Sequence, residues 1–359
     1  LLNLRFPQID MVWTKNKIRL DSGEIVDAQS PIIVSASRST DIPAFYADWF
    51  FNRLERGYSA WTNPFNGSKC YISYQNTRFI VFWSKNPKPL IPYLAKLRAR
   101  NIGCYIQFTL NDYVSEGLEK SVPSVDERIH TFKELVGILG YGSVIWRFDP
   151  LVLTDTISVD DLIRKIEYIG DNLKGYTKKL VFSFVDIALY KKVESNLKKA
   201  GIAYKEWSPD LMNEFASKLS QLNKKWNYDL ATCGEKIDID QYGILHNKCV
   251  DDTLMIQLAS NDSVLMEHLG VSVQECLLFD VFPEGAIDLG DGRYAQKVKN
   301  SKDKGQRAFC GCIASKDIGE YNTCAHQCEY CYANSSKEIA LANLARHRQN
   351  PLTDTITGK

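Results

Sequence analysis

The chain has 359 residues, of which 45% are hydrophobic and 24% charged, and these proportions are those of a folded globular protein. Its 44 Lys and Arg residues nearly balance its 43 Asp and Glu residues, which argues against a protein whose main role is to coat nucleic acid, although a local basic groove stays open. The apolar runs are too short for a membrane span, and the first residues lack the basic segment and long apolar stretch of a signal peptide. We therefore expect a cytoplasmic protein that does not enter the membrane.

From residue 31 onward the sequence alternates short β-rich runs with amphipathic helical stretches. The runs predicted as strands of one sheet are 31–37, 59–64, 78–84, 102–108, 143–148, 178–184 and 228–232. The predicted helices between and after them are 44–57, 89–101, 124–140, 158–173, 189–201 and 208–227. Ser124, followed three residues later by Glu127, is typical of a helix N-terminal capping box.

This alternation, with strands that are nearly continuous apolar runs, predicts an α/β fold with a parallel sheet covered by helices. About seven strand–helix units come close to a full or partial (β/α) TIM-like barrel. A doubly wound open sheet is the alternative, weakened because no G-x-G-x-x-G turn follows a strand. We divide the chain into an N-terminal extension (1–30), the barrel (31–233), a helical and cysteine-rich C-terminal region packing on the barrel (234–350) and a loose tail (351–359).

Polar side chains follow the predicted strands where each apolar run stops. They are Ser37, Arg38, Thr40, Asp41, Asn63, Lys85, Asn86, Thr109, Asn111, Arg147, Asp149, Asp186, Cys233 and Glu235. Because the carboxyl ends of parallel barrel strands share one face, and that face carries the active site, these residues are candidates for function. The alternative is that they are ordinary polar loop residues.

Three of the ten cysteines, Cys324, Cys328 and Cys331, crowd into the stretch TCAHQCEYCYAN (323–334). Without a secretory signal, such thiols are expected to be reduced and to serve as ligands or catalysts. A four-iron cluster held by three cysteines leaves one iron free to bind something else. A structural zinc site would need a fourth ligand, such as His326 or a distant cysteine.

The spacing of these cysteines, with an aromatic residue before the third, resembles the signature of the radical S-adenosylmethionine enzymes. CEYCY is also locally similar to the cluster loop of the spore photoproduct lyases, a DNA-repair branch of that superfamily. The whole chain resembles an uncharacterised bacterial family, a domain-of-unknown-function family, that carries such a cluster at its C-terminus. That resemblance runs through SASRSTDIPAFYADWF, FWSKNP, FTLNDY, WRFDP, KDKGQRAFCGC, SKDIGEYNTC and CEYCYAN.

The resemblance implies a full or partial barrel and a 4Fe–4S cluster on Cys324, Cys328 and Cys331. The cluster would bind S-adenosylmethionine and cleave it reductively to a 5′-deoxyadenosyl radical, with an electron donor such as flavodoxin or ferredoxin. It does not supply the substrate, and a nucleic-acid substrate stays open although the charge does not indicate one. The alternative is a non-catalytic barrel stapled by zinc or an iron–sulfur cluster that acts as a binding or structural subunit.

Four further cysteines, Cys233, Cys249, Cys310 and Cys312, could form a second metal centre, either iron–sulfur or zinc. The alternative is that they are scattered thiols.

Because the first and last elements of a barrel are neighbours, residues 323–334 are predicted to fold back over the carboxyl ends of the strands, beside 38–43. Lys85, Arg147 and Asp149 are the candidate catalytic residues near this loop. The candidate cofactor-binding residues are Arg38, Asp41, Thr109, Arg147 and Tyr330, of which the two arginines suit a carboxylate. The alternative is that Arg38–Asp41 and Arg147–Asp149 are structural ion pairs only.

Overall fold

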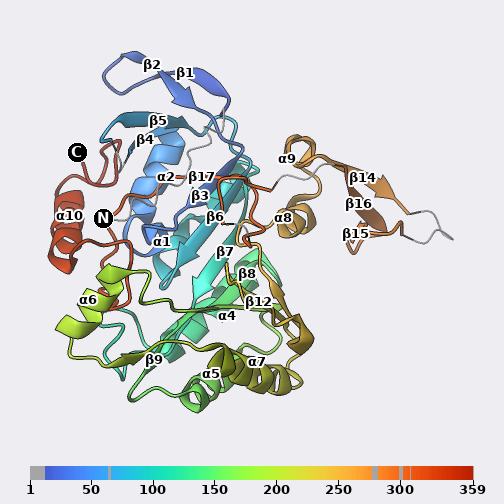
Figure 1. Ribbon diagram of the computed structural model, residues 1–359. Coiled ribbons are helices and arrows are strands. Elements are labelled where there is room, and N and C mark those ends of the chain that lie inside the picture. Colours follow the sequence, from blue (N-terminus) through green and yellow to red (C-terminus); the bar gives the residue numbers. More distant parts are fainter. Residues whose placement is uncertain (1–12, 64–65, 277–281, 299–301, 308, 359) are drawn as a thin grey trace.

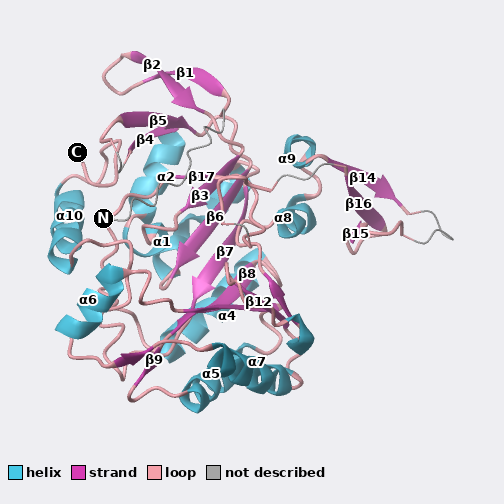
Figure 2. Cartoon of the chain, viewed as in Figure 1, coloured by secondary structure: helices cyan, strands magenta, loops and turns pink. Residues whose placement is uncertain are grey.

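The computed structural model describes residues 13–358, except 64–65, 277–281, 299–301 and 308. At its centre lies an eight-stranded parallel sheet flanked by helices (Figures 1 and 2). Its strands, in order across the sheet, are β13 (Ile244–His246), β12 (Asp229–Thr232), β10 (Lys179–Phe184), β8 (Val144–Leu151), β7 (Gly103–Thr109), β6 (Phe79–Ser84), β3 (Ile33–Ala36) and β17 (Lys316–Asp317). The predicted α/β class with a parallel sheet is confirmed.

The sheet does not close into a TIM barrel. From β3 to β13 each strand lies beside the next strand of the sheet along the chain, as in a (β/α) barrel. In the described part of the chain, however, the edge strands β13 and β17 do not pair with each other. Both are short, three and two residues long, and offer few backbone groups for pairing.

Six of the seven strands predicted for this sheet belong to it, and one does not. The run predicted at 59–64 corresponds to β4 (Tyr58–Thr62), which pairs antiparallel with β5 (Lys69–Ser73) in a separate sheet. That sheet also contains β1 (Lys15–Arg19) and β2 (Ile25–Gln29). The main sheet instead takes β13 and β17 from the region after residue 233, which the sequence did not indicate as strands.

Along the chain, most of the helices lie between strands of the main sheet. They are α1 (Ile42–Phe45), α2 (Ala47–Arg56), η1 (Lys88–Tyr93), α3 (Leu94–Ala99), α4 (Val125–Leu139), α5 (Val159–Leu173), α6 (Lys191–Lys199) and α7 (Pro209–Asn223). The capping box predicted at Ser124 and Glu127 is present at the start of α4, and Ser158 caps α5 in the same way. These caps fix the residue at which each helix begins.

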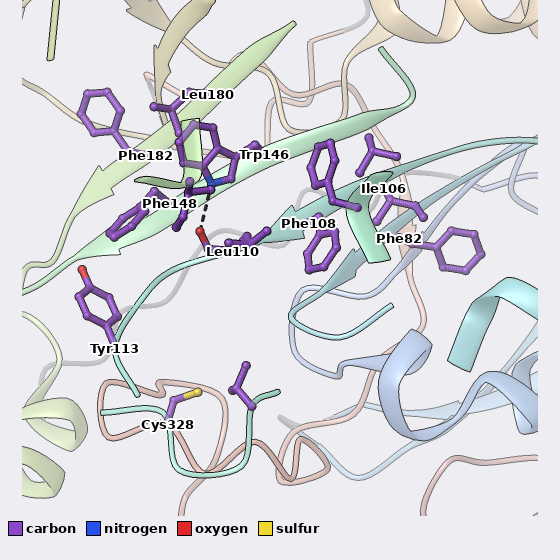
Figure 3. Packing of buried hydrophobic residues seen from close by; sticks show 14 of the residues in the cluster. Phe82, Ile106, Phe108, Leu110, Tyr113, Trp146, Phe148, Leu180, Phe182 and Cys328 are labelled. Atoms are coloured by element: carbon purple, nitrogen blue, oxygen red, sulfur yellow. Dashed lines mark hydrogen bonds between the residues drawn. The ribbon is translucent and has the colours of Figure 1, made fainter. Parts of the chain in front are cut away.

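Alternate residues of the strands pack on opposite faces of the sheet. Val34, Ile80 and Ile106 belong to the larger hydrophobic cluster, which Figure 3 shows around Phe108 and Trp146. Their neighbours Ile33, Phe79 and Tyr105 belong to a second cluster with residues of α8 (Asp252–Ala259) and α9 (Ser263–Leu269). The second face of the sheet is therefore covered by the chain that follows residue 233 (Figure 1).

The other described elements lie outside the main sheet. They are β9 (Leu153–Thr154) with β11 (Tyr204–Lys205), η2 (Asp240–Tyr242), the antiparallel set β14 (Val271–Glu275), β16 (Arg293–Lys297) and β15 (Ile287–Asp288), and α10 (Lys337–Gln349). None of the described helices has the length and apolar character needed to cross a bilayer.

Residues 351–358 are packed against the rest of the molecule, and the prediction of a loose tail is wrong for them. Trp49 of α2 donates a hydrogen bond from Nε1 to the carbonyl of Thr353 at 2.9 Å. Thr355 and Ile356 are buried, and the Thr357 hydroxyl donates to Glu320 at 2.8 Å. Apolar and hydrogen-bonded contacts therefore hold a segment whose composition looks like a linker.

We expect Ile356→Ala to lower the free energy of unfolding by about 3 kcal/mol, because a fully buried aliphatic side chain is truncated there. Leu352→Ala, at an exposed position of the same segment, is the matched control and should cost less than about 0.5 kcal/mol. Denaturant unfolding of the two variants measures the difference. Equal, small losses would contradict the packed position of this segment.

Candidate metal centre

The stretch 323–334, called the cysteine loop below, lies against the segment that follows β3. The hydroxyls of Thr323 and Thr40 are 2.7 Å apart, and Tyr46 donates a hydrogen bond to the Thr323 carbonyl at 2.7 Å. Near the other end of the loop, the Tyr332 hydroxyl donates to the Arg38 carbonyl at 3.1 Å. The cysteine loop therefore covers the carboxyl end of β3, and its predicted position beside 38–43 is confirmed.

His326 and Asp41 form the central anchor of the cysteine loop. Nε2 of His326 is 2.7 Å from Oδ2 of Asp41, and its Nδ1 is 3.1 Å from the Ser121 carbonyl. Asp41 also accepts the backbone N–H of Lys85 at 2.8 Å and caps α1 through Ala44. Both ring nitrogens of the buried histidine thus face oxygen partners, and neither is directed at the thiols as a zinc ligand.

Tyr330 connects the cysteine loop to a buried charge network at the ends of β6 and β7. The Lys85 ammonium donates to Glu119 at 2.6 Å and to the Tyr330 hydroxyl at 2.8 Å, and that hydroxyl in turn donates to Glu119. Asn111 donates to the same hydroxyl at 3.1 Å. The side chains of Tyr330 and Lys85 therefore hold each other in position.

Glu119 is fully buried, and Nη1 of Arg128 lies 3.8 Å from its second oxygen. Burial acts to raise the pKa of this carboxyl, but the neighbouring Lys85 and Arg128 outweigh it and lower the pKa to about 2. Neither Glu119 nor Arg128 follows a strand, so no local pattern pointed to either residue.

The three thiols of the cysteine loop are near enough to influence one another's charge, and Cys328 is buried while Cys324 and Cys331 are half-buried. Burial raises the pKa of Cys328 to about 12, against the lowering effect of Lys85. Burial also raises the pKa of Cys324, and Asp41 and the other two thiols add to that rise. Gln327 has a left-handed backbone (φ 58°), which lets the chain turn between the first two cysteines. Figure 3 shows Cys328 at the border of the larger hydrophobic cluster.

The structure also gathers the other four cysteines of interest, called the four-thiol site below. Sγ of Cys233, after β12, is 3.2 Å from Sγ of Cys249, after β13. Sγ of Cys312 accepts the backbone N–H groups of Cys249 at 3.2 Å and Val250 at 3.3 Å. The Cys310 thiol interacts with that of Cys312. These cysteines are therefore not scattered.

The charges of these sulfurs depend on one another. Hydrogen bonds with Cys233 and Cys312, together with Arg147, hold the pKa of Cys249 well below its usual value. Hydrogen bonding with Cys249 and Cys310 raises the pKa of Cys312. Sulfurs this close cannot all ionise unless a cation shares their charge.

Arg147 faces the four-thiol site. Its Nη1 donates to Sγ of Cys249 and to Oε1 of Gln107, both at 3.2 Å, and its Nη2 pairs with Asp149. Asp149 also accepts a hydrogen bond from Ser183. The buried guanidinium could bind a cofactor carboxylate only by giving up these partners. Gln107 was missed, although a polar residue inside the apolar run CYIQF was a usable signal.

The Arg38 side chain lies near Cys312 and Cys249 of the four-thiol site, and its backbone carbonyl contacts Tyr332 of the cysteine loop. Its guanidinium is stacked over Trp83 at 5.0 Å and is 3.9 Å from Asp317. Burial acts to lower its pKa, but Asp317, Cys312 and Cys249 act together to raise it. Thr109, at the end of β7, is the register partner of Arg147.

Among the described residues, no group of three or more His, Cys, Asp or Glu side chains is spaced as a metal-ion site. Hydrogen bonds nevertheless join the sulfurs of the four-thiol site, and the thiols of the cysteine loop are near enough to raise the pKa of Cys324. The residue types suit thiophilic centres, zinc or iron–sulfur.

Comparison with known proteins gives one match. A protein-family model described as "Domain of unknown function (DUF1848)" matches residues 33–333, from the first residue of β3 to the cysteine loop. No curated protein and no solved structure matches the chain. The matched span includes both groups of thiols.

Proposed function

This chain belongs to the DUF1848 family, whose description assigns no activity, and we propose from its site that it is a radical S-adenosylmethionine enzyme. The observation that carries the proposal is the position of Cys324, Cys328 and Cys331. They lie on one short loop over the carboxyl end of a parallel β/α sheet, near enough to influence one another's charge, with Cys328 buried and the other two half-buried.

The residues present fit a 4Fe–4S cluster with three protein ligands. Three thiols are available, and His326 is held away from them by Asp41 and Ser121, so that a fourth position is left for another molecule. When bound, such a cluster supplies the electron that cleaves S-adenosylmethionine to methionine and a 5′-deoxyadenosyl radical.

The chain's own residues would hold and shield this centre. Lys85 lowers the pKa of Cys328 and would stabilise its thiolate. Glu119 and Tyr330 keep the Lys85 ammonium in place, and the buried surroundings of Cys328 exclude water from that side. For S-adenosylmethionine, the side chains of Arg38, Thr109 and Tyr330 are candidate contacts because they lie at the same end of the sheet.

The order of the strands supports a partial barrel for this enzyme. Six consecutive crossovers keep one winding direction along the sheet from β3 to β13. We place the substrate at the carboxyl end of these strands, beside the cysteine loop. A flavodoxin or ferredoxin in the cytoplasm is the proposed electron donor.

The test is anaerobic reconstitution of the full chain with iron and sulfide. We expect a brown protein with about four irons per chain at the cysteine loop, and formation of 5′-deoxyadenosine when dithionite and S-adenosylmethionine are added. A protein that takes up zinc but no iron would contradict the proposal. A fully loaded cluster that yields no 5′-deoxyadenosine would instead favour a binding or structural subunit.

A further inference from the structure

Two sulfurs of the four-thiol site lie close enough together for both to bind a single metal ion. The Cys233 and Cys249 sulfurs, 3.2 Å apart, are well beyond the ~2.05 Å of a disulfide. Four thiolates around one tetrahedral zinc ion, with Zn–S bonds of about 2.3 Å, have sulfurs about 3.8 Å apart. A four-iron cluster would place a cube of iron and sulfide between its ligands and spread them farther. We propose that Cys233, Cys249, Cys310 and Cys312 bind one Zn²⁺.

The groups around these sulfurs are hydrogen-bond donors. Sγ of Cys249 accepts from Arg147 at 3.2 Å and from Nδ2 of Asn247 at 3.3 Å. Sγ of Cys312 accepts two backbone N–H groups, from Cys249 and Val250. Donors that point at sulfur stabilise thiolates and orient them as ligands. Buried thiols that bind no metal would not need these hydrogen-bond donors.

Charge balance fits the same assignment. Four thiolates and one Zn²⁺ carry a net charge of −2, which would be costly in a buried place without cations. The Arg147 guanidinium contacts the site directly, and its own position is held by Gln107 and Asp149. Arg38, above Trp83, is the second cation on the side of Cys312.

A site closed by four protein ligands is structural, because it leaves no position for substrate. Here it would join the turns after β12 and β13 to residues 310–313. The N–H of Ile313 donates to the Val250 carbonyl at 3.1 Å, beside the proposed ion. Three residues after Ile313, the chain enters β17 and pairs with β3. The ion would therefore fix the approach of the chain to the cysteine loop, independently of what that loop binds.

The experiment uses the full chain with Cys324, Cys328 and Cys331 all replaced by alanine, purified with a reductant and without added metal. We expect about one zinc per chain by elemental analysis, and the intense visible absorption of tetrahedral thiolate coordination after exchange for Co²⁺. Adding Cys249→Ser or Cys310→Ser should abolish both signals, whereas adding Cys104→Ser, in β7 and outside both thiol groups, should leave them unchanged.

A second measurement does not depend on the folding of the serine variants. The alanine variant keeps seven of the ten thiols, and titration with an organomercurial should release its zinc as the four thiols of the site react. Zinc below about a tenth of an equivalent, a Cys233–Cys249 disulfide detected as the loss of two hydrogens, or iron at this site would each overturn the proposal. If the zinc is present but the parent chain forms no 5′-deoxyadenosine, the proposed function fails and this site stands.

Discussion

Cys328→Ala is expected to remove the iron of the cysteine loop and to lower 5′-deoxyadenosine formation on the order of a hundredfold or more. Cys328 is the buried thiol of the three, next to Lys85, and loss of a ligand should cost more than the 10–100-fold typical of outer contacts. Iron analysis and single-turnover product assays after anaerobic reconstitution measure both effects.

Cys70→Ala provides the matched control for this prediction, because Cys70 lies in β5 of the side sheet and belongs to neither thiol group. It should keep the parent's iron content and product yield. A Cys328→Ala chain with undiminished iron and product would show that the cysteine loop does not hold the cluster.

Glu119→Gln is expected to lower the free energy of unfolding by about 4 kcal/mol, because it leaves Lys85 and Arg128 without their buried counter-charge. Glu55→Gln is the control, since Glu55 pairs with Lys96 at 2.6 Å where both side chains are 45% exposed. That change should cost less than about 1 kcal/mol. Urea unfolding of both variants gives the comparison.

A double variant sharpens this test. Adding Lys85→Met to Glu119→Gln removes one of the two unpaired cations, and part of the lost stability should return. If Lys85→Met lowered the stability of the Glu119→Gln chain as much as it lowers that of the parent chain, the two residues would not be coupled as the structure indicates.

The same network predicts a pH dependence. The pKa of Glu119 falls from 4.5 to about 2 on folding, so its ionisation stabilises the fold above pH 4.5. That contribution, about 3 kcal/mol, is lost as the pH falls from 4.5 toward about 2. In Glu119→Gln, the free energy of unfolding should therefore fall less steeply as the pH is lowered. An unchanged pH dependence would contradict the assignment.

The long strands of the main sheet could be predicted because burial on both faces makes them continuous apolar runs, as at Phe79–Ser84 and Gly103–Thr109. The edge strands could not. Lys316 and Asp317 have no strand pattern of their own, and they are extended only because β3 offers them a partner far away in sequence. In the same way, the sequence of β4 resembles that of a main-sheet strand, and only its antiparallel pairing with β5 places it in a separate sheet.

The candidate site shows the same division between local and distant information. The spacing of the cysteine loop indicated three thiols around one centre. The expected barrel predicted where the loop would lie, although the sheet is open. The face of the sheet toward which the Arg147 side chain points could also be predicted. Side chains alternate across a strand, and Gln107 in the neighbouring strand points to the same face. The buried partner of Lys85 could not be predicted from local sequence, because Glu119 lies in a loop between β7 and α4.

The pairing of β17 with β3 has a consequence for biosynthesis. Ser35 and Asp317, which share a hydrogen bond, are separated by 282 positions. At about 5–20 residues per second, a ribosome needs about 15–60 s to make the residues between them. During that time β3 is an unprotected edge in the nascent polypeptide, open to pairing with other chains. The two proposed metal centres could form only after translation has passed these positions, so a prematurely terminated product would expose an unpaired strand edge and lack the ligands of both.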